Sequence, residues 1–274
     1  MRLTSSCIVK TPYRCNTITD FLIAQPLTID VELDDESTGC MSVKGIEFEA
    51  TVLYAGISDF TRLSVELSPA EMLLYMNMFL TWAGECSGSE RFFVIERFVD
   101  NALVLLFSTR FGSDDPFIDA LQAARWMGEH DAMKFSPRIG IASGKVMAGF
   151  TGTHGNSNAS VFGRPLALAG ACARLNPGGD VASAITFPSD EWAERTLEKV
   201  FQPIEYDHPE KGRVRQPQTW TLGAPREVDF PGIGRLFLRD IASFIHWMPS
   251  LAAAGKAKEL VRLIKSQGYY KKNN

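Results

Sequence analysis

Residues 52–64, VLYAGISDFTRLS, constrain the fold of the 274-residue chain more than any other stretch. An apolar run of Val52, Leu53 and Tyr54 leads into a short turn, and a helix start follows immediately. Apolar residues of this kind, ending at Gly and Asp, indicate a buried strand. We therefore expect a strand, a tight turn and a helix in direct succession.

The rest of the chain supplies further strands and helices in a regular order. Short runs rich in Val, Ile or Phe and bounded by Gly, Asp, Asn or Ser predict strands, and apolar residues at helical spacing predict helices. The order strand, helix, strand, strand, helix, strand predicts an α+β fold of the ferredoxin-like βαββαβ type. The expected strands are 47–55, 92–98, 101–108, 137–142, 145–150 and 158–162, and the expected helices are 69–84, 116–130 and 165–175.

Segments of weaker pattern flank this core. We divide the chain into an N-terminal extension (1–45), a central domain (46–225) and a C-terminal helical extension (226–274). Residues 201–222 predict an extra hairpin. Two helical patterns in residues 232–267, separated by a proline, predict helices that pack on the domain or across a dimer rather than on a membrane.

Composition limits the classes of function. With 45% hydrophobic and 22% charged residues, the sequence predicts a soluble globular protein with a sizeable core. A net charge of −4 argues against nonspecific nucleic-acid binding. Five scattered cysteines without a C-x-x-C pair indicate reduced thiols. Because no signal segment or membrane-length apolar run is visible, we expect a cytoplasmic protein without membrane insertion.

Four segments in order carry a resemblance to a known family. Residues 52–64, 95–107 (IERFVDNALVLLF), 137–149 (PRIGIASGKVMAG) and 160–175 (SVFGRPLALAGACARL) resemble the motifs of class III nucleotidyl cyclases. The family patterns are F-A-D-I-x-G-F-T, a G-D hairpin, R-I-G-I-x-x-G-x-V-x-x-G and G-x-x-V-N-x-A-x-R-L. A late K-G turn in PEKGRV (209–214) also matches, so the resemblance spans about residues 48–222.

The resemblance implies a lyase that uses two divalent ions, Mn²⁺ or Mg²⁺. In this family a ribose 3′-hydroxyl attacks its own α-phosphate and expels pyrophosphate, and two metals held by carboxylates assist. It implies that Asp100 is a catalytic, metal-binding carboxylate and that the Ile57 carbonyl is a metal ligand. The first metal aspartate of the family falls on Gly56. Asp59 is a candidate substitute, with a polar turn residue or helix cap as the other interpretation.

Two interpretations of Gly56 remain open. One is a natural loss that leaves a catalytically dead module, and the other is a single change in an otherwise active sequence. The helix of residues 160–175 also departs from the family. Its ribose-orienting Asn falls on Ala167 and its transition-state Arg on Ala171, while Arg174 lies about one turn later and is a candidate for the arginine's catalytic role.

The resemblance also implies residues that contact the substrate. Backbone N–H groups from Ser58 to Thr61, at a helix start, favour phosphate. Glu96 and Ser160 fall at the positions that recognise the base, where glutamate allows guanine. The implied substrate contacts are Tyr54, Ser58, Asp59, Phe60, Thr61, Glu96, Arg97, Ser160 and Arg213.

Within the family, the chain is most similar to the standalone Pycsar pyrimidine cyclases of antiphage defence. This resemblance implies that UTP, or CTP, is converted to a cyclic monophosphate that activates a separate effector. It implies a homodimer in which Gly56, Ile57 and Asp100 of one subunit meet the 160–175 helix of the other. The alternatives are a guanylate cyclase, suggested by Glu96, and a non-enzymatic nucleotide-binding or dimerisation module.

Overall fold

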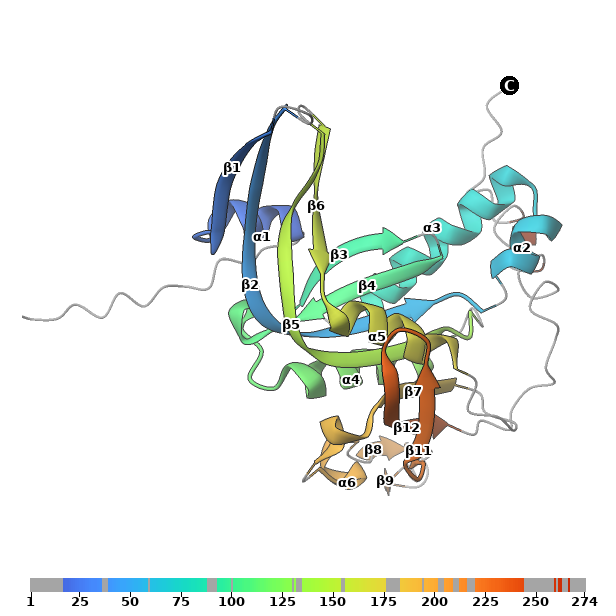
Figure 1. Cartoon of the computed structure of the whole chain (residues 1–274). Coiled ribbons are helices and arrows are strands. Elements are labelled where there is room, and N and C mark those ends of the chain that lie inside the picture. Colours follow the sequence, from blue (N-terminus) through green and yellow to red (C-terminus); the bar gives the residue numbers. More distant parts are fainter. Residues whose placement is uncertain are drawn as a thin grey trace, which may run out of the picture.

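The computed structural model describes a mixed α+β fold (Figure 1). The described residues are 17–35, 39–58, 60–87, 93–99, 101–129, 131, 135–153, 156–175, 183–193, 195–201, 205–208, 212–215, 220–243, 259, 261–262 and 266. The helices are α1 (Ile18–Ala24), α2 (Phe60–Glu66), α3 (Pro69–Cys86), α4 (Pro116–Glu129), α5 (Arg164–Arg174) and α6 (Leu197–Val200), with 3-10 turns η1 (Thr109–Phe111) and η2 (Ser189–Trp192). The strands are β1 (Ile29–Asp35), β2 (Gly39–Gly56), β3 (Phe93–Val99), β4 (Ala102–Phe107), β5 (Arg138–Thr153), β6 (Asn156–Phe162), β7 (Ser183–Pro188), β8 (Glu205–His208), β9 (Gly212–Arg215), β10 (Trp220–Leu222), β11 (Arg226–Phe230) and β12 (Gly234–Ser243).

A ten-stranded sheet organises the molecule. Its order is β10-β12-β7-β5-β2-β4-β3, with β1 paired to β2, β6 to β5 and β11 to β12. In the order β5-β2-β4-β3, each strand is antiparallel to its neighbours, and the strands are connected through α2, α3 and α4. This is the ferredoxin-like βαββαβ arrangement, so the predicted fold class is confirmed. None of the described helices is long and apolar enough to cross a membrane.

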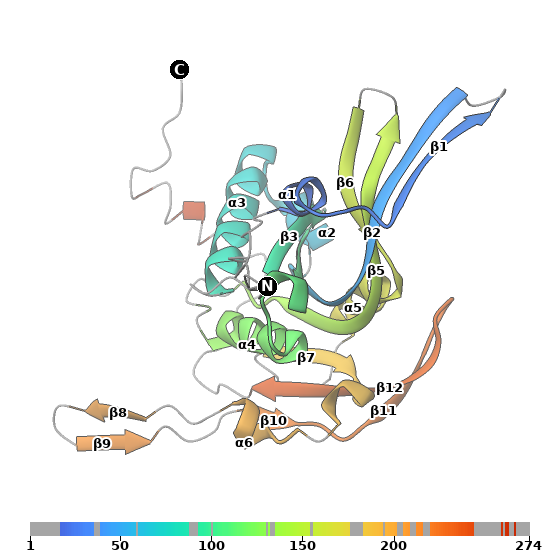
Figure 2. The same ribbon diagram turned by 90° about the vertical axis from the view of Figure 1, so that its left-hand side faces the viewer.

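Successive side chains of β2 point to opposite faces of the sheet and belong to two different apolar clusters. Leu53, Ala55 and Ile57 face α3 and α4, together with Leu103 and Ile139 of the neighbouring strands. Even-numbered β2 residues, from Ile46 to Val52, face the other side, where α1 and α5 pack. Figure 2 shows α3 and α4 on one side of the strands and α5 on the other. Both faces of the central sheet are therefore covered, and β4 is buried at every position.

Helix α3 begins as its sequence predicts. Ser68 is the N-cap, and its side chain accepts a hydrogen bond from the N–H of Glu71, whose carboxylate in turn accepts one from the Ser68 N–H at 3.0 Å. This reciprocal capping satisfies two N–H groups that a helix start otherwise leaves without partners. Pro69 follows at the first helical position, where its missing N–H costs nothing.

Two of the strands are longer than predicted. The expected separate strands 137–142 and 145–150 are one strand, β5, because backbone pairing with β2 continues through Gly144 opposite Ala50. Gly144 keeps this pairing although its φ is +145°, a conformation that glycine adopts without steric cost. Strand β2 runs unbroken across residue 45 and pairs with β1, forming with β5 and β6 the arm seen in Figure 1. The division of the chain at residue 45 stays a prediction.

The C-terminal region differs from the expected helices. Residues 234–243 form strand β12, which pairs with β7 on one side and with β10 and β11 on the other, so the helix predicted there is wrong. Leu236 and Leu238 are two residues apart, which is strand spacing, and backbone pairing on both sides overrides the weaker helical pattern. The proline that was expected to separate the two helices lies outside the described residues, but residues 259, 261, 262 and 266 are helical.

The predicted hairpin in residues 201–222 is present in part. Strands β8 and β9 pair as a small separate sheet, with His208 opposite Gly212. Strand β10, however, belongs to the main sheet, where Trp220 is opposite Ser243. Trp220 is buried and its indole N–H donates to the Glu129 carboxylate at 2.9 Å, which ties β10 to the end of α4.

The position of α5 depends on a glycine. A Cβ added at Gly140 of β5 would lie 2.0 Å from the carbonyl oxygen of Ala169 and 2.5 Å from the N of Ala173. Both atoms belong to the α5 backbone, so any side chain at residue 140 would push the helix off the sheet. The absence of a side chain thus allows α5 to lie directly on β5.

We expect Gly140→Ala to lower the free energy of unfolding by about 1–3 kcal/mol, because overpacking against backbone atoms forces the helix to move. Urea unfolding followed by circular dichroism measures this. The control is Gly84→Ala in α3, where a Cβ meets nothing within 4 Å. Its helix should gain up to about 1 kcal/mol. Equal stability of Gly140→Ala and the unchanged protein would contradict this packing argument.

Candidate functional site

A pocket of about 530 Å³ lies where β2 ends and α2 begins. We call it the arginine pocket. It collects residues from the strand–turn–helix stretch, from the adjoining strands and from the end of α5. Its lining residues are Tyr54, Gly56, Ile57, Phe60, Thr61, Arg62, Asn101, Arg138, Ala173 and Arg174.

Strand register explains why these residues meet. Gly56, the last residue of β2, is opposite Ala102 of β4 on one side and opposite Arg138 of β5 on the other. The N–H of Ile57 donates to the carbonyl oxygen of Asn101 at 2.9 Å. The ends of three neighbouring strands therefore converge on the turn before α2.

The charged side chains among the described residues that line the arginine pocket are all positive. Arg62, Arg138 and Arg174 come from α2, β5 and α5, and none of the described lining residues carries a carboxylate. Arg62 lies 3.4 Å from Glu66, one turn along its own helix. Arg138 and Arg174 are exposed. Guanidinium groups pair strongly with phosphate oxygens, so the pocket suits a polyanion.

Tyr54 fills the space between two glycines. A Cβ added at Gly56 would lie 3.1 Å from Tyr54 Cε1, and one added at Gly170 of α5 would lie 3.6 Å from Cδ2 and Cε2. One edge of the ring thus lies against β2 and the other against α5. The ring occupies space next to the position from which a residue 56 side chain would project.

The donor set for a metal is incomplete in the described part of the pocket. Mg²⁺ and Mn²⁺ prefer carboxylate and carbonyl oxygens. The Ile57 turn offers backbone carbonyls, but Gly56 offers no carboxylate. No group of three or more acidic, His or Cys side chains is found among the described residues. A divalent ion here therefore depends on Asp59 or Asp100, which lie outside the described residues.

Most of the predicted site residues that can be checked meet in this pocket. Tyr54, Gly56, Ile57, Phe60, Thr61 and Arg174 all line it. Ser58 does not, since its hydroxyl donates to the carbonyl oxygen of Ser136 at 2.8 Å and anchors the turn instead.

Strand β3 carries Glu96 and Arg97, whose side chains lie outside the described part. Its pairing with β4 is irregular between Ile95 and Arg97, at Glu96. Such a bulge changes the direction in which side chains point, and nothing in the sequence pattern indicates it.

Two predicted residues lie away from the pocket of their own chain. Ser160 is opposite Gly149 on β5, eleven residues beyond Arg138, or about 36 Å along the strand. Its hydroxyl accepts from Thr151 at 3.2 Å. Arg213 lies on β9, in the separate two-stranded sheet. Within one chain these side chains do not join the site, so they could serve it only from a second copy or after movement.

Sequence reasoning missed four members of the pocket. None was expected there: Arg62, Asn101, Arg138 and Ala173. Arg138 opens the R-I-G-I segment that carries the resemblance, so that motif was a usable signal. Its place opposite Gly56, however, follows from strand register, which one sequence does not reveal.

A second pocket of about 750 Å³ adjoins the first, and Tyr54 and Arg174 line both. We call it the apolar pocket. Ala167 and Ala171, the positions where the family carries its Asn and Arg, lie in its wall. The opposite wall is the β11–β12 turn, with Phe230, Pro231, Gly232 and Ile233.

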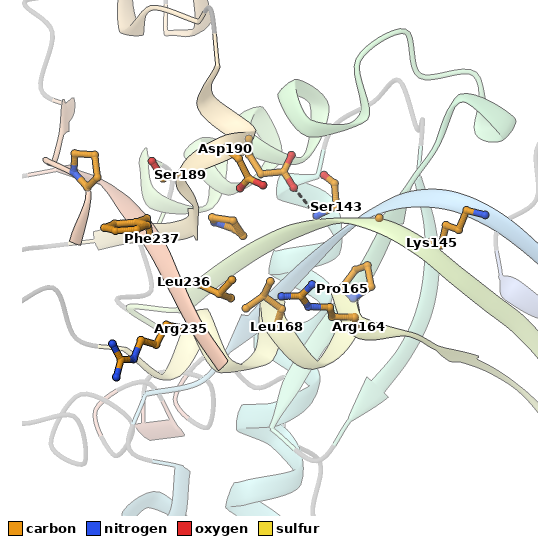
Figure 3. Close-up of a pocket in the computed structure, with 14 residues that line it drawn as sticks. Ser143, Lys145, Arg164, Pro165, Leu168, Ser189, Asp190, Arg235, Leu236 and Phe237 are labelled. Carbon is orange, nitrogen blue, oxygen red and sulfur yellow. Dashed lines mark hydrogen bonds between the residues drawn. The ribbon is translucent and has the colours of Figure 1, made fainter. Parts of the chain in front are cut away.

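A third pocket, of about 820 Å³, lies at the other end of α5 (Figure 3). It contains none of the predicted site residues. Lys145, Arg164 and Arg235 line it together with Asp190 and Glu191. The backbone N–H of Ser143 donates to the Glu191 carboxylate at 2.7 Å, as the dashed line in Figure 3 shows. Its mixed charges select no single class of ligand.

Comparison with known proteins shows the fold. No family model matches the sequence, and no curated protein matches it. The structure is similar to the guanylyl cyclase Cya2 (18% identity, 76% of this chain and 99% of that chain, TM-score 0.54) and to the adenylyl cyclase CyaB from P. aeruginosa (16%, 75% and 99%, TM-score 0.55). It is also similar to the guanylate cyclase domain of RhGC from Catenaria anguillulae in complex with GTP (16%, 73% and 99%, TM-score 0.53). The chain thus has the fold of class III cyclase catalytic domains.

Glu191 gives a prediction on pH dependence. Burial raises the pKa of its carboxyl above the usual value, although the Ser143 hydrogen bond opposes the shift. The folded protein therefore binds this proton more tightly than the unfolded chain does. Stability from this group is present at low pH and is lost as pH rises from about 4.3 through the raised pKa.

We expect Glu191→Gln, which keeps an oxygen acceptor for the Ser143 N–H, to melt at a higher temperature than the unchanged protein at about pH 7. The difference should disappear near pH 4, where both side chains are neutral. Melting curves from about pH 4 to about pH 8 measure it, with the exposed Glu198→Gln as control. A lower melting temperature for Glu191→Gln at every pH would refute the assignment.

Proposed function

We propose that this chain is a nucleotidyl cyclase, or descends from one, and binds a nucleoside triphosphate in the arginine pocket. The observation that carries the proposal is the convergence, in a cyclase fold, of the β2–α2 turn with Arg138 and Arg174. The guanidinium groups of three arginines would pair with the phosphate oxygens of a triphosphate. The reaction would yield a 3′,5′-cyclic monophosphate and pyrophosphate.

Named residues have distinct roles in this proposal. Arg138 and Arg174 hold the phosphates and offset the negative charge that grows as pyrophosphate leaves. The Ile57 carbonyl and the carboxylate of Asp100 would hold divalent ions. When bound, such ions lower the pKa of the 3′-hydroxyl and neutralise the triphosphate. Arg174 belongs to the same chain as Gly56, whereas the resemblance implied a helix contributed by the partner.

Gly56 supports a second candidate function, a nucleotide-binding or dimerisation module without turnover. The first carboxylate of the family is absent, and the Tyr54 ring lies 3.1 Å from where a Cβ at residue 56 would be.

Since Tyr54 is partly exposed, its ring has room to move by a few tenths of an ångström. A carboxylate at residue 56 is therefore compatible with the fold.

The substrate and assembly are finer parts of the proposal. We favour UTP or CTP over GTP because the sequence is most similar to the pyrimidine cyclases within the family, whereas Glu96 alone would allow guanine. A homodimer is supported by the position of Ser160, which one chain does not bring to its own arginine pocket. A product-sensing effector in antiphage defence would complete the pathway.

The test restores the missing carboxylate. We expect Gly56→Asp to convert one of the four ribonucleoside triphosphates to its cyclic monophosphate in the presence of Mn²⁺, as detected by mass spectrometry. Gly56→Asn is the matched control, because it has the same size but no charge. If the folded Gly56→Asp variant binds triphosphate without turnover, the non-enzymatic module takes the place of the cyclase.

The arginines give a separate prediction. We expect Arg138→Ala and Arg174→Ala each to weaken binding of inorganic tripolyphosphate about tenfold, as one charge-assisted contact is lost. Isothermal titration calorimetry measures the affinity. Arg235→Ala is the control, since Arg235 is 75% exposed in the third pocket. Equal affinity in all three variants would remove the arginine pocket from the proposal.

A further inference from the structure

The sequence-based expectations assign no ligand to the apolar pocket, although the predicted site residues Tyr54 and Arg174 line it. It lies between α5 and the β11–β12 turn, which are side by side in Figure 1. Its walls are the side chains of Val104, Leu166, Leu175, Phe230 and Ile233, together with small residues of α5. At about 750 Å³ it falls within the range of small-molecule sites, which are mostly apolar with a few polar groups.

Continuity with the arginine pocket indicates what could occupy it. Tyr54 and Arg174 line both pockets, so the two adjoin at these side chains. One half is rich in guanidinium groups and the other is apolar with aromatic surface. A nucleotide has the same polarity, with phosphates at one end and a flat base at the other.

We propose that the base and ribose of the nucleotide lie in the apolar pocket while its phosphates lie in the arginine pocket. The β11–β12 hairpin of the same chain then forms one wall of the base subsite. This inference rests on the proposed function and names a substrate-binding element that the cyclase-like motifs do not include. It assigns recognition of the base to Tyr54, Ala171 and Ile233 of one chain, in place of Glu96 and Ser160, which the resemblance implied.

The hairpin is held in place well enough to serve as a wall. Phe230 is buried, and Leu238 is fully buried in the cluster that includes Leu168 and Ala169 of α5. At the turn, the N–H of Ile233 donates to the carbonyl oxygen of Phe230 at 3.0 Å. Pocket walls that are fixed before binding reduce the ordering cost of the bound state.

The chemistry of the subsite predicts how it discriminates between bases. Among the described side chains that line it, only Tyr54 and Arg174 carry hydrogen-bonding groups. Apolar walls discriminate between ligands by size, and by modest factors, whereas paired buried polar groups discriminate strongly. We therefore expect preference among bases to follow ring size.

The experiment fills the pocket from each wall. Ala171→Trp adds bulk from α5 and Ile233→Trp adds it from the hairpin. We expect each to weaken binding of UTP and GTP at least tenfold while the affinity for inorganic tripolyphosphate stays within twofold. Calorimetry in Mg²⁺ measures all three ligands, and melting curves show that the variants fold.

Matched controls place the same changes elsewhere. Ile23 is 74% exposed on α1 and Ala70 is exposed at the start of α3, so Ile23→Trp and Ala70→Trp should bind every ligand normally. If Ile233→Trp binds UTP and GTP as the unchanged protein does, the proposed base subsite is refuted, whatever the result for Ala171→Trp. A loss of binding in Ala171→Trp alone would also be expected if α5 served the site of a partner subunit. If the unchanged protein binds tripolyphosphate but no nucleotide, or binds neither, the proposed function fails and this inference fails with it.

Discussion

The close contact between α5 and Gly140 determines where both halves of the site lie. Because the helix backbone rests on the β5 backbone, its last turn reaches the end of β2 and brings Arg174 to Gly56. The same contact sets Gly170 against the Tyr54 ring, which lines both the arginine pocket and the apolar pocket. A bulkier residue at position 140 would displace the helix and change both pockets together. The shapes of both pockets therefore depend on the absence of a side chain at Gly140.

The sequence predicts the ferredoxin-like core because strand and helix periods there are unambiguous. The run Ala102–Phe107 is a buried central strand, and Ser68, Pro69 and Glu71 mark a helix start by capping chemistry alone. The sequence does not predict β12, since Leu236, Leu238 and Ile241 fit a helical pattern as well as a strand. Pairing with β7 and β10 decides between the two, and that pairing depends on residues about 20 and about 50 positions away.

In the candidate site, too, local sequence patterns predict some residues, while strand pairing decides the position of others. Motif residues on one continuous segment, such as Ile57, Phe60 and Thr61, lie together as the strand–turn–helix pattern implies. Arg138 joins them through the register of two strands, and Ser160 is separated from them by the length of β5. Both outcomes are properties of the sheet rather than of any local pattern. A resemblance carries residue identities, but the pairing of strands decides which of them meet within one chain.

The C-terminal hairpin contributes to the surroundings of Gly56 through the Tyr54 ring. Strand β12 is inserted between β7 and β10, and Asp240 secures it by accepting from Thr186 at 2.6 Å and from Arg226 at 2.9 Å. The hairpin turn is thereby held opposite α5, and Tyr54 is confined between α5 and β2. A side chain at residue 56 has to share space with that ring. Gly56 and the apolar pocket therefore both adjoin the Tyr54 ring.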